Sequence, residues 1–98
     1  MGDLTIKDQT FGEATKIPGI TFITARFDGI LGMGFDSISV DGVVTPWANM
    51  LAQQLVDEPL FSFSFLRGSK DGGALVLGGI DPDAFVGEHT WAPVTRKG

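Results

Sequence analysis

The segment FSFSFLR at residues 61–67 constrains the fold most, because its apolar and polar side chains alternate without a break. Successive side chains of a strand point to opposite faces, so the phenylalanines are predicted on one face and the serines on the other. The turn sequence GSKDGG follows, and after it comes the apolar segment ALVLGG. These segments together predict a pair of strands joined by a turn.

Three further segments are predicted to be strands. The segment LTIKDQTFGEAT alternates loosely, with Leu4, Ile6 and Phe11 as candidate inward residues. GILGMG at residues 29–34 is short and apolar, and its glycines suit the close approach of another backbone. TWAPV at residues 90–94 is predicted to be the last strand. The organisation is therefore expected to be mainly β.

The pattern changes to a helical period after Thr45, which is a good N-cap residue in front of a proline. We predict one short helix, Pro46 to Leu55, on which the following residues share a face: Trp47, Met50, Leu51, Gln54 and Leu55. Turns are predicted at KIPGITF, where Pro18 fixes φ, and at Asp41-Gly42, which signals a hairpin or loop. The segment IDPDAFVGEH predicts a loop or short helical turn.

The composition excludes several classes of protein. The chain has 98 residues, of which 43% are hydrophobic and 19% charged, and this is the composition of a globular domain or part of one. Its net charge of −5 leaves no basic patch for nucleic acid, so no nucleic-acid partner is expected. Without cysteine it has no disulfide or thiol nucleophile. No apolar run approaches the roughly 20 residues of a membrane helix, so no membrane partner is expected either.

The polar residues do not form a self-sufficient active site. His89 is the only histidine, so a histidine-rich metal site is excluded and a surface or packing role is expected. Ser62 and Ser64 are explained by strand alternation, and no G-x-S-x-G motif occurs. Three pairs of acidic residues lack the spacing of a calcium loop: Asp36 with Asp41, Asp57 with Glu58, and Asp81 with Asp83. We therefore expect no metal and no cofactor.

Several longer motifs carry a resemblance to a known family. FDGILGMGFDSIS, LFSFSFLRG, GGALVLGGIDPDAFVGE and TWAPVTRKG together resemble the eukaryotic pepsin-like aspartic endopeptidases, the cathepsin D and pepsin group. The resemblance runs from about Leu4 to Gly98 in unbroken order. It implies a partial lobe of a bilobal acid protease. Residues 1–98 would be an internal segment, the later part of the amino-terminal lobe leading into the central sheet.

Asp28 is a candidate catalytic carboxylate that the resemblance rejects. In the family, each catalytic aspartate lies in Asp-Thr/Ser-Gly-Thr/Ser, whereas Asp28 is followed by Gly29 and Ile30. The stretch instead resembles the family's hydrophobic-hydrophobic-Gly element, here Ile30, Leu31 and Gly32, which packs beside the catalytic loop in a ψ-shaped crossing. No Asp-Thr-Gly or Asp-Ser-Gly occurs in the 98 residues, and neither does a tyrosine for the family's flap. No catalytic residue is therefore predicted.

The resemblance also implies a function for the parent enzyme. That enzyme would hydrolyse peptide bonds with two aspartates in general acid–base catalysis, while the isolated chain is expected to be inactive. Phe27 and Ile30 would contribute to the apolar wall that receives substrate side chains amino-terminal to the cleaved bond, with ordinary core packing as the alternative. The implied partners are a peptide or protein substrate and the remaining protease segments. The family works in the secretory pathway, in lysosomes or vacuoles, or outside the cell.

A different class of function also fits the sequence, namely a non-catalytic β-rich module that binds other chains or itself. Strands that lack their neighbours leave unpaired edges and exposed phenylalanine and leucine faces, which favour β-augmentation or self-association. The isolated chain is accordingly expected to be marginally stable or oligomeric.

Overall fold

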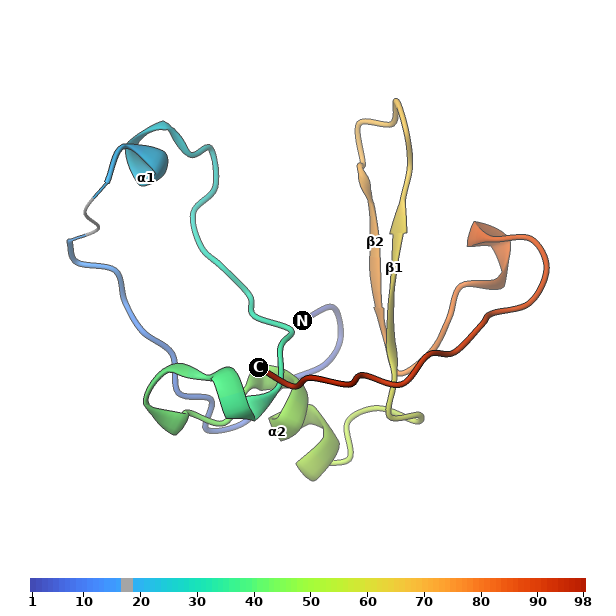
Figure 1. Cartoon of the computed structure of the whole chain (residues 1–98), viewed down its shortest axis with the longest axis horizontal. Helices are drawn as coiled ribbons and strands as arrows, with labels where there is room; N and C mark the ends of the chain where they lie inside the picture. Colours follow the sequence, from blue (N-terminus) through green and yellow to red (C-terminus); the bar gives the residue numbers. More distant parts are fainter. Residues whose placement is uncertain (17–18) are drawn as a thin grey trace.

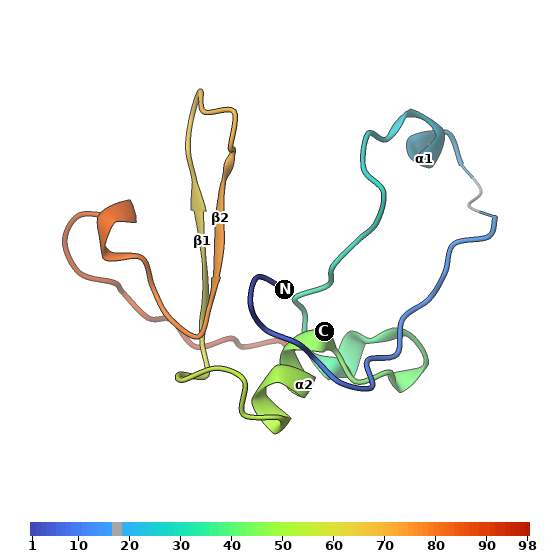
Figure 2. The same cartoon turned by 180° about the vertical axis from the view of Figure 1, so that it is seen from behind.

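The computed structural model describes residues 1–16 and 19–98, and Figure 1 shows the course of the chain. A two-stranded sheet stands on one side and a wide loop of chain, with a short helical turn at its far end, on the other, and the longest helix lies at the base between them (Figures 1 and 2). The elements in chain order are α1 (Ile20–Thr24), η1 (Asp36–Ile38), η2 (Val40–Gly42), α2 (Pro46–Ala52), β1 (Phe61–Phe65), β2 (Gly73–Leu77) and η3 (Pro82–Ala84).

The hairpin predicted from the alternating segment is confirmed. Strands β1 and β2 pair antiparallel, with Phe63 opposite Leu75 at the centre of the register. At the turn, the Leu66 amide donates to the Gly72 carbonyl oxygen at 2.9 Å. Gly73 has φ 153°, and a Cβ there would collide with the Ser64 carbonyl oxygen, so the first residue of β2 needs to be glycine.

Helix α2 starts where the sequence predicted and ends earlier. The Thr45 hydroxyl oxygen accepts a hydrogen bond from the Ala48 amide at 3.3 Å, and Pro46 occupies the first turn. The helix stops at Ala52 rather than Leu55, because Gln54 adopts φ 55° and turns the chain away. Met50, on this helix, is the only fully buried side chain in the part of the chain that the structure describes.

Three of the predicted strands are wrong, since the segments near residues 4–15, 29–34 and 90–94 have no strand structure. A strand requires a neighbour for its backbone hydrogen bonds, and in residues 1–16 and 19–98 the sheet contains only β1 and β2. The prediction of a single helix is also wrong, because α1 forms one further short turn of helix.

The turn predictions have mixed outcomes. Asp41-Gly42 makes a tight reversal with φ values of 56° and 65°, but it lies within η2 and joins no strands. The Asp81 carboxylate caps η3 by accepting from the Asp83 amide at 3.0 Å, which confirms the short helical turn. The turn predicted at Pro18 lies partly outside the described residues.

The chain is open and its core is small. Its radius of gyration is 15.9 Å, whereas a compact domain of this length has about 13 Å. Many large hydrophobic side chains are exposed, among them Phe63, Phe65 and Ile30. None of the helices in the described ranges is long and apolar enough to cross a membrane. The packing that a compact lobe requires is therefore incomplete within this chain.

Candidate functional site

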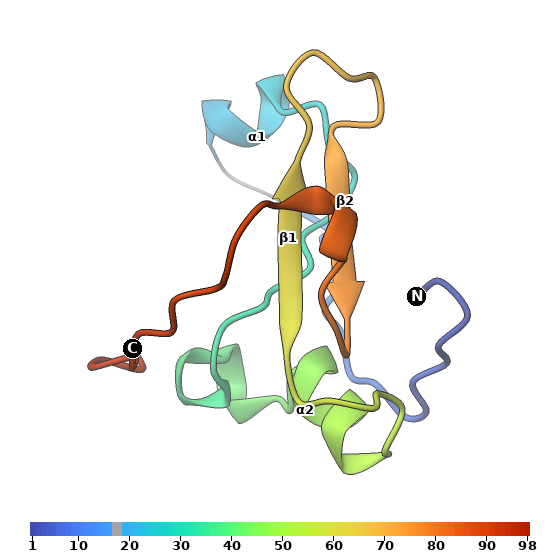
Figure 3. The same cartoon turned by 90° about the vertical axis from the view of Figure 1, so that its right-hand side faces the viewer.

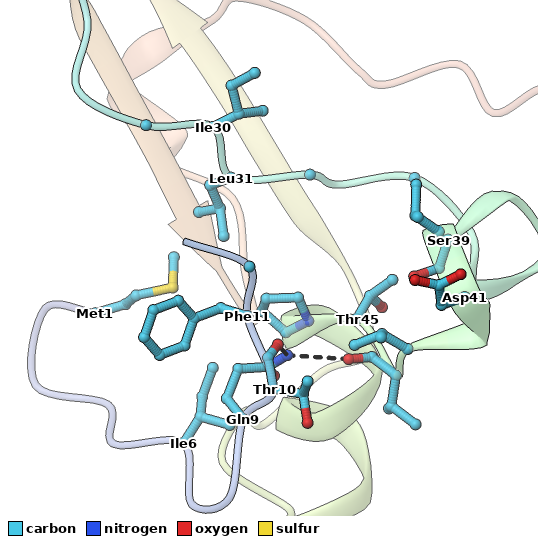
Figure 4. A pocket seen from close by; sticks show the side chains of 18 of the residues that line it. Met1, Ile6, Gln9, Thr10, Phe11, Ile30, Leu31, Ser39, Asp41 and Thr45 are labelled. Carbon is cyan, nitrogen blue, oxygen red and sulfur yellow. Dashed lines mark hydrogen bonds between the residues drawn. The ribbon is translucent and has the colours of Figure 1, made fainter. Parts of the chain in front are cut away.

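A groove of about 1340 Å³ lies between two segments that are distant in sequence, residues 1–14 and 28–46. Figure 4 shows Met1, Ile6 and Phe11 on one side, and Ile30 and Leu31 across from them. These side chains give the groove a largely apolar lining. No group of three metal-ligating side chains occurs in the part of the chain that the structure describes.

Side-chain amides hold the first wall of the groove in place. The Asn49 amide nitrogen donates to the Gln9 Oε1 atom at 2.8 Å. Gln9 Nε2 in turn donates to the Val44 carbonyl oxygen at 3.0 Å (Figure 4). One turn further along α2, Gln53 exchanges two hydrogen bonds with the backbone of Lys7, at 2.8 and 3.0 Å. The amino-terminal segment is therefore held by hydrogen bonds from side-chain amides, and not by backbone hydrogen bonds to a neighbouring strand.

This role of Asn49 and Gln53 was not predicted from the sequence. Their spacing of four residues places both amides on one helix face, and this was the available signal. It identifies a polar face, but it does not say which segment that face will contact. Gln9 was likewise not singled out, because it lies in a segment predicted to be a strand.

Only some of the predicted site residues line the groove. Ile30, Leu31 and Gly32 line the groove, and the Ile30 side chain is 79% exposed. Phe27 is 54% exposed and does not line the groove. Neither Phe27 nor Ile30 belongs to the buried core of this chain, and their role in a substrate wall stays a prediction. The predicted strand at Ile30 is absent, and its role in a ψ-shaped crossing stays a prediction.

Asp28 also lines the groove, as an exposed residue between Phe27 and Gly29. No hydrogen bond to a neighbouring hydroxyl group holds its carboxylate in the described part of the chain. Two carboxylates that share a proton need such donors and close mutual contact. That Asp28 is not a catalytic residue stays a prediction from its sequence context.

Among the residues that the structure describes, Asp36 is the acidic group with a clearly displaced pKa. Its carboxylate accepts a hydrogen bond from the Thr45 backbone amide at 3.0 Å. This bond, together with one to the Thr45 side chain, lowers the pKa of Asp36 below its usual value, and desolvation opposes the shift. Since Thr45 also caps α2, the ionised Asp36 connects η1 to the start of the helix. This contact supports the second wall of the groove.

His89 packs against aromatic rings, as a surface or packing role requires. Its ring centroid lies 4.1 Å from that of Phe85 and 6.4 Å from that of Trp91. The three residues lie in the exposed carboxyl-terminal segment that follows η3. In the described part of the chain, these ring contacts are the interactions found for His89, which fits the expected packing role.

A hairpin, a capped helix and a groove with an Ile-Leu-Gly element are consistent with a partial lobe of the pepsin-like fold. The family model described as eukaryotic aspartyl protease matches residues 1–98, so the chain belongs to this family. This match confirms the resemblance and the partial pepsin-like lobe that it implied, whereas the mainly β organisation is only loosely supported, because the described residues form a single two-stranded sheet.

Plant and animal relatives match along the whole chain. Aspartic proteinase A1 of Arabidopsis thaliana is 57% identical over all of this chain, which covers 20% of that protein. Phytepsin of Hordeum vulgare is 55% identical with the same coverage of each protein. Cathepsin D of Gallus gallus is 52% identical over 99% of this chain and 25% of its own length. The chain thus spans about a fifth to a quarter of the relatives that it matches.

Proposed function

We propose that the chain is a segment of an aspartic endopeptidase, namely the later part of the amino-terminal lobe leading into the central sheet. The observation that carries this proposal is the family match over residues 1–98 combined with the lack of any Asp-Thr-Gly or Asp-Ser-Gly in them. Both catalytic aspartates would then come from other parts of the enzyme. The isolated 98 residues are inactive in this proposal.

In the complete enzyme, the reaction is general acid–base hydrolysis of a peptide bond. One carboxylate takes a proton from a water molecule while the water oxygen bonds to the carbonyl carbon. The other, protonated carboxyl gives its proton to the carbonyl oxygen. The resulting tetrahedral carbon then expels the amine, which leaves with a proton. This segment supports that chemistry through Ile30, Leu31 and Gly32, placed beside a catalytic loop.

The second contribution of this segment to the complete enzyme is part of the wall of the substrate site. Phe27 and Ile30 would contact the substrate side chain on the amino-terminal side of the cleaved bond. Their exposure in this chain supports the proposal, because an apolar side chain in a substrate wall must be open before substrate binds. A peptide or protein substrate would complete the burial of these side chains.

Inactivity is tested with the purified chain and a fluorogenic peptide at acidic pH, with and without pepstatin. The expected result is no pepstatin-sensitive cleavage at any chain concentration. Cleavage activity that co-purifies with the chain over successive chromatography steps and is inhibited by pepstatin would contradict the proposal.

The wall is tested in an enzyme that contains this segment. F27A and I30A are expected to lower kcat/KM by about 10–200-fold for peptides with a large apolar residue before the cleaved bond. Peptides with a small residue there are expected to change little. The control is V86A, because Val86 is fully exposed and does not line the groove. Equal effects on both kinds of peptide would assign Phe27 and Ile30 to core packing.

A second candidate function is a non-catalytic binding or self-associating module. The observation that favours it is the accessible surface of 8700 Å², whereas a compact protein of 10.4 kDa exposes about 5,400 Å². Light scattering of the chain over a range of concentrations tests this function. A rise in mass with concentration supports it, and a monomer at high concentration that binds no peptide counts against it.

A further inference from the structure

The outer edge of β1 is an unpaired strand edge. The Gly78 amide donates to the Leu60 carbonyl oxygen at 2.8 Å, and the Leu66 amide donates to Gly72, so even-numbered residues of this strand bond inward to β2. Antiparallel ladders alternate, and hence the backbone N–H and C=O groups of Phe61, Phe63 and Phe65 point outward. In residues 1–16 and 19–98, no other strand lies beside β1 (Figure 3).

The edge of β2 is less open. The residues Met1 to Leu4 line a hollow together with Leu75, Val76 and Leu77. Figures 1 and 3 both show the amino terminus on the β2 side of the hairpin. On the β1 side, Figures 1 and 3 show the carboxyl-terminal segment with η3, and in the described part of the chain this segment forms no strand paired with β1.

The side chains of β1 make its edge apolar as well as unpaired. Phe63 is 52% exposed and Phe65 is 85% exposed, and their rings stack with centroids 6.2 Å apart. Neither β1 nor β2 contains a charged residue, so no charge on either strand repels a second strand.

We propose that two copies of the chain pair through β1, antiparallel, about a two-fold axis at Phe63. In this register Phe63 lies opposite Phe63 of the second copy, and Phe61 lies opposite Phe65. Because the outward groups belong to these three residues, the pairing gives each of them a hydrogen-bond partner. The phenylalanine side chains also meet across the new strand pair, a favourable aromatic arrangement. The sheet grows to four strands.

The charges at the two ends of β1 complement this arrangement. Asp57 and Glu58 precede the strand, and Arg67 and Lys70 follow it. Antiparallel pairing brings the end of one strand beside the start of the other. Continued beyond the strands, the register places Arg67 opposite Pro59 of the second copy, one residue away from its Glu58, once on each side of the axis. A parallel arrangement would place like charges together.

The exposed area is sufficient for such a contact. The chain exposes about 3,300 Å² more than a compact protein of its mass, whereas a standard interface buries about 800 Å² on each partner. The inference rests on the self-association proposed as the second function and identifies the surface that would carry it. It is independent of the peptidase assignment.

Cysteine cross-linking tests the register, because the chain has no cysteine of its own. Residues opposite each other in a hydrogen-bonded pair have Cα atoms about 5.5 Å apart, within the disulfide range of roughly 4.4–6.8 Å. F63C is expected to form a disulfide dimer at least about ten-fold faster than V86C. V86C is the control because Val86 is more exposed than Phe63, so accessibility alone would favour the opposite order.

The flanking positions provide a second, independent register test. F65C alone is expected to cross-link no faster than V86C, while a mixture of F61C and F65C gives the mixed dimer. A strand pairing displaced by two residues would change which mixture reacts, and this result would overturn the two-fold axis at Phe63.

Charge reversal tests the pairing without changing the strands. E58R and R67E each replace an exposed residue outside β1, and each is expected to weaken association about two- to thirty-fold. In an equimolar mixture, the E58R chain offers two cations and the R67E chain offers two anions, so mixed dimers regain both attractive contacts. Restored association in the mixture supports the proposal, and equally weak association of the mixture and the single variants overturns it.

The possible results of these experiments distinguish self-association of the chain from the specific pairing through β1. A wild-type chain that is monomeric by light scattering would overturn both the self-association and the β1 pairing. A wild-type dimer in which F63C reacts no faster than V86C would overturn only the pairing, since the copies would then meet elsewhere. Neither result bears on the peptidase segment, which is tested separately by the substrate-wall variants.

Discussion

Truncation of Met50 to alanine is the strongest test of where this chain has a core. Met50 is fully buried on α2, whereas its neighbour Leu51 is 37% exposed. Replacing a buried methionine with alanine costs about 2–5 kcal/mol in transfer free energy and cavity formation. Complete burial of leucine is worth about 1.5–3 kcal/mol, so the partly exposed Leu51 is expected to lose about 1–2 kcal/mol in L51A. L51A is the matched control, because both variants place alanine in the same helix.

The free energy of unfolding is measured by urea titration, with the fluorescence of Trp47 as the signal. Trp47 contacts Phe61 at a ring-centroid distance of 5.1 Å, so it reports on the contact between α2 and β1. A W91F background removes the other tryptophan. Domain stabilities are about 5–15 kcal/mol, and this open chain is expected near or below the lower end. We expect M50A to be largely unfolded without urea and L51A to retain a transition. An equal loss of unfolding free energy in M50A and L51A would refute the conclusion that the core is centred on Met50.

Three further predictions concern local contacts. T45A removes the cap of α2 and is expected to lower the free energy of unfolding by about 1 kcal/mol, with T45S restoring most of it in urea titrations. Because the pKa of Asp36 is lowered on folding, its ionised contact stabilises the chain above the pKa of an unfolded aspartate. This stabilisation is lost as the pH falls through the lower folded value. D36N keeps an acceptor oxygen and is expected to remove this component from acid-unfolding curves; an unchanged curve would contradict it. G73A is expected to destabilise the hairpin by about 1–3 kcal/mol, visible as faster amide exchange in β1.

Local signals predicted the elements whose stabilising contacts lie within a few residues. The Thr45-Pro46 pair fixed the start of α2, because the hydroxyl that accepts from Ala48 is part of the same turn. The alternation of FSFSF and the glycines after it predicted the hairpin, since the second strand follows directly in sequence. The short turn at Asp81-Pro82 was predicted for the same reason.

The sequence failed where a segment depends on a distant neighbour. GILGMG has the composition of a strand, but the described chain gives it no strand to pair with, so it stays extended and lines a groove. The amino-terminal segment alternates loosely, yet it is held by Gln9 and by the Gln53 amide rather than by a sheet. Periodicity describes which side chains can share a face and cannot supply the partner for that face.

The sequence by itself determined the family, through an ordered series of motifs, and it determined the absence of a catalytic Asp-Thr/Ser-Gly from these 98 residues. Only the tertiary structure decided which faces are covered. It brought residues 1–14 opposite residues 28–46, buried Met50, and left the outer edge of β1 without a strand. The physical reason is that burial and backbone pairing are properties of two segments meeting in space, whereas a motif belongs to one segment.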